Sequence, residues 1–139
     1  MKIQLLSDIH VEFWRGLSKA GLENQLYSLV QPADVLVLAG DINTGRVNTV
    51  ETIKFFAQHY RHVIYFPGNH EYYAGLGIDE YDRIQESLPD NVYYLNPGVV
   101  YIDGITFVGA TLWTNFGEDL ITEELAKKYI NDFSRTKIT

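Results

Sequence analysis

The sequence contains no cysteine. Disulfides and thiolate metal sites are therefore excluded. Any metal ion would have to be bound by His, Asp, Glu or Asn side chains. Such ligands suit hard or borderline cations such as Mn, Fe, Zn, Ni or Mg.

Long apolar runs are also missing. No stretch approaches the roughly 20 apolar residues that a membrane-spanning helix needs. The first residues, "MKIQLLSDIH", combine one Lys with a short apolar run, whereas a signal peptide needs a longer apolar core and a small-residue cleavage site. These absences predict a cytoplasmic protein without a membrane partner.

Basic residues are few, with 11 Lys and Arg against 18 Asp and Glu and a net charge of -7. A surface that coats nucleic acid needs clustered Lys and Arg, so nucleic acid is expected only as a substrate. A phosphate-ester substrate stays compatible with this charge if a bound metal supplies local positive charge. The sequence has neither a GxGxxG fingerprint nor a Walker A motif, so a dinucleotide or P-loop site is not supported.

The apolar pattern predicts an α/β fold. Strands are expected at residues 3–7, 34–40 and 62–66, alternating with helices at 19–30, from an N-cap at Asn48 to Tyr60, and around 81–88. This order indicates that the first three strands are parallel. The segments "NVYYL", "VVYID" and "ITFVGA" are then expected to form an antiparallel meander, followed by a helix over "ITEELAKKYINDF".

Polar residues follow each of the first three predicted strands, in "SDIH", "GDIN" and "GNHE". Ligands bind at the carboxyl ends of strands in open parallel sheets. Asp8 and His10, two residues apart at a strand end, are expected to face one ion. The Asp41 carboxylate can bridge two ions, Asn69 offers a carbonyl oxygen, and His70 would face whatever the ions hold. Two cations about 3.5–4 Å apart can clamp a phosphoryl group and generate hydroxide, and a nearby His can protonate the leaving oxygen.

These motifs resemble the first three signature blocks of the calcineurin-like metallophosphoesterases. The matching residues are Asp8-x-His10, Gly40-Asp41 and Gly68-Asn69-His70-Glu71, and "GATLWTNF" resembles a segment of small bacterial and phage members. The resemblance implies a four-layer α/β/β/α sandwich and hydrolysis of a phosphomonoester or phosphodiester by a metal-bridged hydroxide. It also implies two divalent ions (Mn, Fe, Zn, Ni or Mg) and a role for each residue. Asp8 and His10 would bind the first ion, Asp41 would bridge, Asn69 would bind the second, and His70 would be the general acid.

The sequence departs from the family pattern after the third block. The family continues with a further metal-binding His and then a Gly-His-x-His block, but the four histidines here are at positions 10, 59, 62 and 70. We therefore expect residues 1–139 to form a single, partial domain that supplies roughly the first half of the sandwich. A truncated product, a processed fragment and a chain completed by another copy or a partner are all open. Because one sheet face would lie bare, we also expect self-association.

Two functions remain open at this point. The first is a metal-dependent phosphoesterase, and the second is a non-catalytic or partner-completed half-domain that retains the fold and a partial metal site. Glu71 is expected either to support His70 or the metal side of the site, or to be solvated. Trp113 is expected in the core. His59 and His62 are expected to be surface or boundary residues.

Overall fold

Four parallel strands form the central sheet. The computed structural model of the protein describes residues 1–75 and 77–136. The strands follow one another across the sheet in chain order: β1 (Ile3–Leu6), β2 (Val35–Ala39), β3 (His62–Phe66) and β4 (Val92–Tyr94). Ile3 pairs with Val35, Val35 with His62, and Val63 with Val92. All four strands therefore end at the same edge of the sheet, where the polar motifs follow them.

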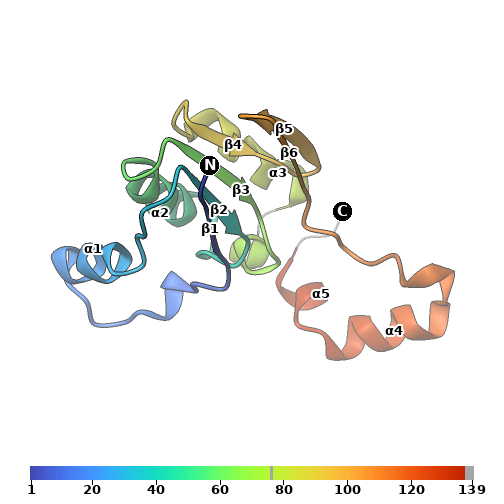
Figure 1. Ribbon diagram of the computed structural model, residues 1–139. Helices are drawn as coiled ribbons and strands as arrows, with labels where there is room; N and C mark the ends of the chain where they lie inside the picture. The colour runs from blue at the N-terminus through green and yellow to red at the C-terminus, as the bar shows by residue number, and fades with distance from the viewer. Residues whose placement is uncertain (76, 137–139) are drawn as a thin grey trace.

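One face of the sheet is covered by helices. These are α1 (Lys19–Tyr27), α2 (Arg46–Ala57), α3 (Ile78–Asp82) and the 3-10 helix η3 (Arg83–Ser87). Figure 1 shows α1 and α2 together on this side. Phe56 of α2 and Ile84 of η3 pack into one core with Leu38 and Tyr65 of the sheet, and all four are fully buried. This core is the larger of the two and supports the strand ends.

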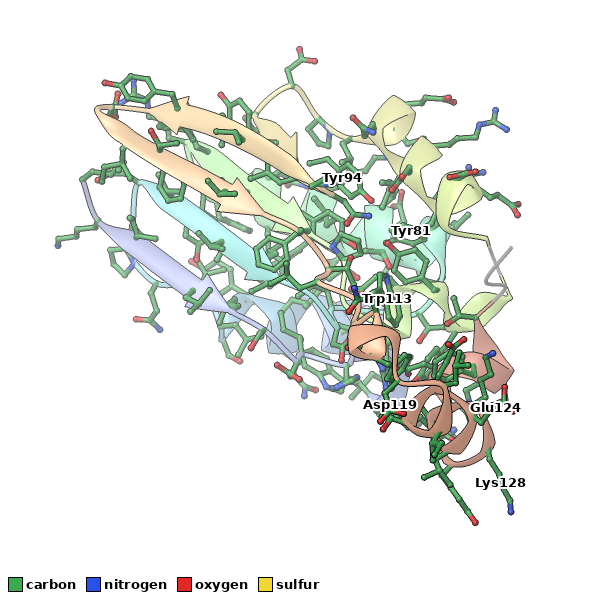
Figure 2. All side chains as sticks on the ribbon, turned by 90° about the vertical axis from the view of Figure 1, so that its right-hand side faces the viewer. Tyr81, Tyr94, Trp113, Asp119, Glu124 and Lys128 are labelled. Atoms are coloured by element: carbon green, nitrogen blue, oxygen red, sulfur yellow. The ribbon has the colours of Figure 1, made fainter. Side chains whose placement is uncertain are left out.

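A β-hairpin lies against the opposite face of the sheet. Strands β5 (Gly98–Ile102) and β6 (Ile105–Gly109) pair antiparallel through the turn Asp103-Gly104, the turn signal that the sequence contains. Ile102 packs with Val35 and Ile64 in a second, smaller core. Helices, sheet and hairpin thus follow the order of the first three layers of an α/β/β/α sandwich, as Figures 1 and 2 show from two sides.

The last part of the described chain is helical. A 3-10 helix η4 (Phe116–Glu118) leads into α4 (Leu120–Tyr129) and the short α5 (Asp132–Arg135). Asp119 caps α4 by accepting hydrogen bonds from the Ile121 and Thr122 N–H groups. Helix α5 lies beside the 3-10 helix η2 (His70–Ala74), which begins within the third polar motif. A segment far along the chain therefore reaches the carboxyl edge of the sheet.

Several predicted elements differ from the structure. "NVYYL" is not part of an antiparallel meander, because β4 pairs parallel with β3 after the α3–η3 crossover. Both faces of β4 are covered, as in β2 and β3: Tyr94 packs toward the helix core and Tyr93 toward the hairpin core. Helix α2 begins earlier than predicted, with Gly45 as N-cap, so the prediction of Asn48 as N-cap is wrong.

Two further corrections concern the C-terminal part. The predicted single helix after residue 120 is interrupted after Tyr129, where Ile130 has an extended backbone. Trp113 is 40% exposed rather than a core residue, and its ring contacts Tyr72 from the surface. In the part of the chain that the structure describes, no helix combines the length and apolar character needed to cross a membrane. The cytoplasmic location stays a prediction.

Candidate metal centre

The loops that follow β1 and β2 run side by side. The Asp8 N–H donates to the Gly40 carbonyl at 3.1 Å, and the His10 N–H donates to the Asp41 carbonyl at 3.0 Å. Asp8, His10 and Asp41 all have positive φ, near 50°, so they lie beyond the strands in left-handed backbone. The strand alternation from which Asp8 and His10 were predicted to face one ion therefore does not apply to them. Backbone pairing between the two loops brings these residues together instead.

Asp8, His10 and Asp41 form a compact group of potential ligands. One ligand atom from each lies within 4.8 Å of the other two, and His10 Nε2 is 3.9 Å from Asp41 Oδ2. Asp8 is exposed, whereas His10 and Asp41 are half-buried. Ligand atoms at about 2.0–2.2 Å from a divalent cation lie up to about 4.4 Å apart, so these three residues fit one ion after a small contraction. Two carboxylates and an imidazole are a donor set for hard or borderline cations.

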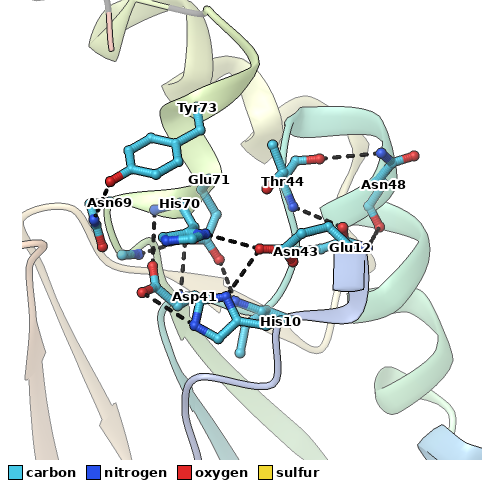
Figure 3. A network of polar contacts seen from close by, with 12 residues as sticks. His10, Glu12, Asp41, Asn43, Thr44, Asn48, Asn69, His70, Glu71 and Tyr73 are labelled. Atoms are coloured by element: carbon cyan, nitrogen blue, oxygen red, sulfur yellow. Dashed lines mark hydrogen bonds and ion pairs between the residues drawn. The ribbon is translucent and has the colours of Figure 1, made fainter. Parts of the chain in front are cut away.

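His70 lies next to this group (Figure 3). Its backbone N–H donates to Asp41 Oδ1 at 3.0 Å, and its ring centroid is 4.4 Å from that of His10. His70 Nδ1 is 3.0 Å from Oε1 of Glu12, a residue that sequence reasoning did not identify. Burial alone would raise the pKa of Glu12, but hydrogen bonds from His10 and His70 outweigh it and hold this pKa below its usual value. The only signal for Glu12 in the sequence is that it follows His10 by two residues.

Asn69 is held from a different direction. Its side-chain amide nitrogen donates to the Tyr73 hydroxyl at 2.9 Å and to Asp132 Oδ1 in α5 at 2.8 Å. The Tyr73 hydroxyl also donates a short hydrogen bond to Asp132. With its nitrogen committed to these partners, the orientation of the amide oxygen is fixed as well. Neither Tyr73 nor Asp132 was predicted as a partner of Asn69. Asp132 lies 63 residues after Asn69, so no local sequence pattern links the two.

Glu71 joins the loops after β2 and β3. Its side chain is fully buried, so of the two alternatives expected for Glu71 the solvated one is wrong. The carboxylate accepts hydrogen bonds from the backbone N–H groups of Asp41, Ile42 and Gly68 at 3.0, 2.8 and 2.8 Å. Burial raises the pKa of Glu71 to about 7, opposed by the hydrogen bond from Ile42, and the Asp41 charge raises it further. Glu71 contacts the backbone around the ligand group rather than the His70 ring.

Two glycines allow these loops to approach closely. A Cβ atom on Gly40, whose φ is +78°, would lie 2.6 Å from the Gly68 nitrogen. A Cβ atom on Gly68 would lie 2.2 Å from Asp41 Oδ1. Both distances are far below a van der Waals contact, so any other residue at these positions would push the two loops apart.

His59 is exposed and His62 is half-buried, so both are surface or boundary residues as predicted. The His59 ring packs against Tyr27 and Phe55, and His62 Nδ1 is 3.2 Å from the Tyr93 hydroxyl. Among the described residues, the two groups of His, Asp and Glu side chains that are close enough to share an ion both include His10.

Three comparisons with known proteins agree with this geometry. A family model described as calcineurin-like phosphoesterase matches residues 1–137. An uncharacterized protein of Acanthamoeba polyphaga mimivirus is 29% identical over 148 residues, which cover 97% of this chain and 51% of that protein. The crystal structure of phosphopantetheinyl hydrolase from Mycobacterium tuberculosis superposes with a TM-score of 0.64 at 18% identity, over 98% of this chain and 55% of the other. The chain thus spans about half the length of these relatives, and the structural likeness concerns the fold.

Proposed function

Because this chain belongs to the calcineurin-like phosphoesterase family, we propose that it is a metal-dependent phosphoesterase acting on phosphomonoesters or phosphodiesters. The family and the fold support the broader class, a metal-dependent hydrolase. One observation carries the proposal. Asp8, His10 and Asp41 converge at the carboxyl ends of two parallel strands, with the His70 imidazole beside them.

Each side chain receives a role in this proposal. Asp8 and His10 would hold the first ion, Asp41 would be shared with a second, and the Asn69 amide oxygen would hold that second ion. When bound, a pair of divalent cations would neutralise phosphoryl charge and supply hydroxide at neutral pH. His70 holds a proton for the leaving oxygen, a task suited to an imidazole because it titrates near neutrality. The hydrogen bond from the His70 N–H to Asp41 supports this role, since it keeps the imidazole beside the bridging carboxylate.

Metal binding and turnover can be tested together on the purified chain. We expect bound Mn²⁺ in near-stoichiometric amounts and hydrolysis of bis(p-nitrophenyl) phosphate. Asp41→Asn should lose both, while Asp90→Asn on the surface should lose neither. No bound metal in the wild type, or equal turnover by Asp41→Asn, would overturn the proposal.

The acid role of His70 has a separate test, which compares good and poor leaving groups. General acid catalysis contributes about 10²–10⁴-fold, and chiefly where the departing oxygen needs a proton. His70→Ala should therefore slow hydrolysis of diphenyl phosphate far more than hydrolysis of bis(p-nitrophenyl) phosphate. Equal losses on the two substrates would show that His70 does not act as the acid.

The second candidate is a non-catalytic or partner-completed half-domain. It is favoured by the coverage of about half of each relative and by the small number of ligands in the proposed assignment, which gives two ions only Asp8, His10, Asp41 and Asn69 among the described residues. In this reading residues 1–139 are one partial domain that keeps a partial metal site. Metal binding by the wild type without any turnover would favour it.

Self-association belongs to the same proposal. The outer face of the hairpin and the hairpin side of β1 expose large apolar side chains: Ile3, Leu5, Val99, Tyr101 and Val108, each more than 45% exposed. Apolar surfaces of this kind are often contact sites, so we propose that they bind a second copy of this chain. Sedimentation should show a dimer at micromolar concentration, which the double variant Tyr101→Ser and Val108→Ser should dissociate. A wild-type monomer would contradict this.

A further inference from the structure

Glu12 contacts both histidines of the candidate site through one oxygen. Its Oε1 atom lies 3.0 Å from His10 Nδ1 and 3.0 Å from His70 Nδ1. The centroids of the two imidazole rings are 4.4 Å apart, and the rings meet edge to face. Figure 3 shows Glu12 between them, with both contacts drawn. A single carboxylate oxygen therefore contacts the Nδ1 atoms of two imidazoles that come from different loops.

The chemistry of these contacts selects one tautomer for each ring. A carboxylate only accepts hydrogen bonds, so each Nδ1 must carry the hydrogen. The Nε2 atom of a neutral ring is then free of hydrogen and can bind a cation, or it can carry the second proton of a charged ring. His10 Nε2 is the atom on the Asp41 side, 3.9 Å from Oδ2. The contact with Glu12 thus turns the free nitrogen of His10 toward the ligand group.

The backbone around Glu12 is built to hold the side chain there. Glu12 lies in a short 3-10 helix, η1 (Val11–Phe13), that follows the left-handed His10. Val11 is buried, and its N–H donates to the Ile42 carbonyl at 3.0 Å, which ties this turn to the loop after β2. The second carboxylate oxygen, Oε2, is buried without a hydrogen-bond partner among the described residues. A buried acceptor without a partner costs about 1–3 kcal/mol, and a water or a cation bound at Oε2 would remove this cost.

We propose that Glu12 is a positioning residue that locks His10 and His70 in the Nδ1–H form. Nε2 of His10 is then presented to the first cation and Nε2 of His70 to the leaving oxygen. The proposal rests on the proposed function for what the two Nε2 atoms do. The tautomer lock itself is a property of the metal-free chain and can be tested without turnover.

The first experiment reads the tautomers by NMR. Long-range ¹H–¹⁵N correlation spectra of the metal-free protein, well above the usual imidazole pKa of about 6.5, identify the protonated nitrogen of each of the four histidines. We expect Nδ1–H for His10 and His70 in the wild type and in Glu12→Gln, whose amide oxygen can accept both hydrogen bonds. In Glu12→Ala both rings should lose this preference, while His59 and His62 keep their wild-type signals. Unchanged His10 and His70 tautomers in Glu12→Ala would overturn the proposal, as would Nε2–H rings in the wild type.

The second experiment separates positioning from direct metal binding, because His10, Glu12 and His70 are also close enough to share an ion. Residues that orient a ligand typically change metal affinity or activity by about 10–100-fold when they are removed. Glu12→Ala should weaken Mn²⁺ binding by that factor and lower kcat with little change in KM. Glu12→Gln should recover most of both losses. If Glu12→Gln is as poor as Glu12→Ala, the carboxylate charge or direct ligation is what matters, and the positioning role is wrong.

The two experiments also distinguish the positioning role of Glu12 from the proposed phosphoesterase activity. A chain that binds Mn²⁺ and shows the expected tautomers but never turns over would contradict the phosphoesterase, not the role of Glu12. If Glu12→Ala does not fold, Glu12→Asp replaces it, because a side chain one methylene shorter cannot reach both rings. It should release at least one ring from the Nδ1–H form, and retention of both would overturn the lock.

Discussion

The two sides of the candidate site are held in different ways. Asp8, His10 and Asp41 lie on loops that bond to each other through the backbone directly beyond the paired ends of β1 and β2. Asn69 and His70, on the loop after β3, take their orientation from distant side chains, Asp132 in α5 and Glu12 in η1. The first side is therefore formed by adjacent loops, whereas the second depends on contacts across the fold.

This difference predicts unequal affinities for the two proposed cations. In the proposed two-ion site, the position of the first cation is formed chiefly by main-chain hydrogen bonds between two adjacent loops. The proposed position of the second cation depends on α5 as well, because Asp132 and Tyr73 hold the Asn69 amide. The chain should accordingly bind one divalent ion more tightly than the other.

The largest effect is expected where the two sides are joined, at Glu71. Glu71→Ala leaves three backbone N–H groups without their acceptor. Each such group costs about 1–3 kcal/mol when it is buried, so the free energy of unfolding in urea should fall by about 3 kcal/mol or more. Glu86→Ala, an exposed substitution, should change it by less than about 0.5 kcal/mol. Equal losses in the two variants would mean that the loops hold together without Glu71.

Smaller effects, confined to metal affinity, are expected from Asp8→Ala and Asn69→Ala, which change the two sides of the candidate site separately. Asp8→Ala removes a proposed direct ligand of the first ion and should weaken the tighter Mn²⁺ binding step by about 100-fold or more, above the range for residues that only orient ligands. Asn69→Ala should leave that step nearly unchanged and weaken the second step. Isothermal titration calorimetry resolves the two steps. If both variants weaken the same step equally, Asp8 and Asn69 do not belong to two separate ion positions.

Much of the site could be predicted from the sequence, for a physical reason. Parallel strands bring their carboxyl ends to one edge, so polar residues that follow three such strands must meet there. The strands themselves are evident as apolar runs such as "VLVLA" in β2. The partners of the site residues were missed because they come from tertiary contacts without a local pattern: Glu12, Tyr73 and Asp132. Strand β4 was misassigned because "NVYYL" matches both a strand of an antiparallel meander and a parallel strand covered on both faces.

The smallest effect is expected at α5. Asp132→Ala removes the acceptor that holds the Asn69 amide and should weaken the second Mn²⁺ step by about tenfold, the lower end of the range for orienting residues. The tighter step and the unfolding free energy should hardly change. Glu124→Ala is the matched control, since Glu124 is exposed on α4 (Figure 2) and forms a surface ion pair with Lys127 at 3.4 Å. An unaltered second step in Asp132→Ala would show that Asn69 is held by its own loop.

The close approach of Gly40 and Gly68 has a consequence for how this chain can diverge. Because neither Gly40 nor Gly68 carries a side chain, the two loops meet here at a main-chain contact distance that does not depend on how the residues of the helix layer pack. Replacements in the helix layer would then erode stability well before they altered the spacing available to a pair of ions. Related chains could replace most of their core residues and keep the same distance between these two loops, provided that both positions remained glycine.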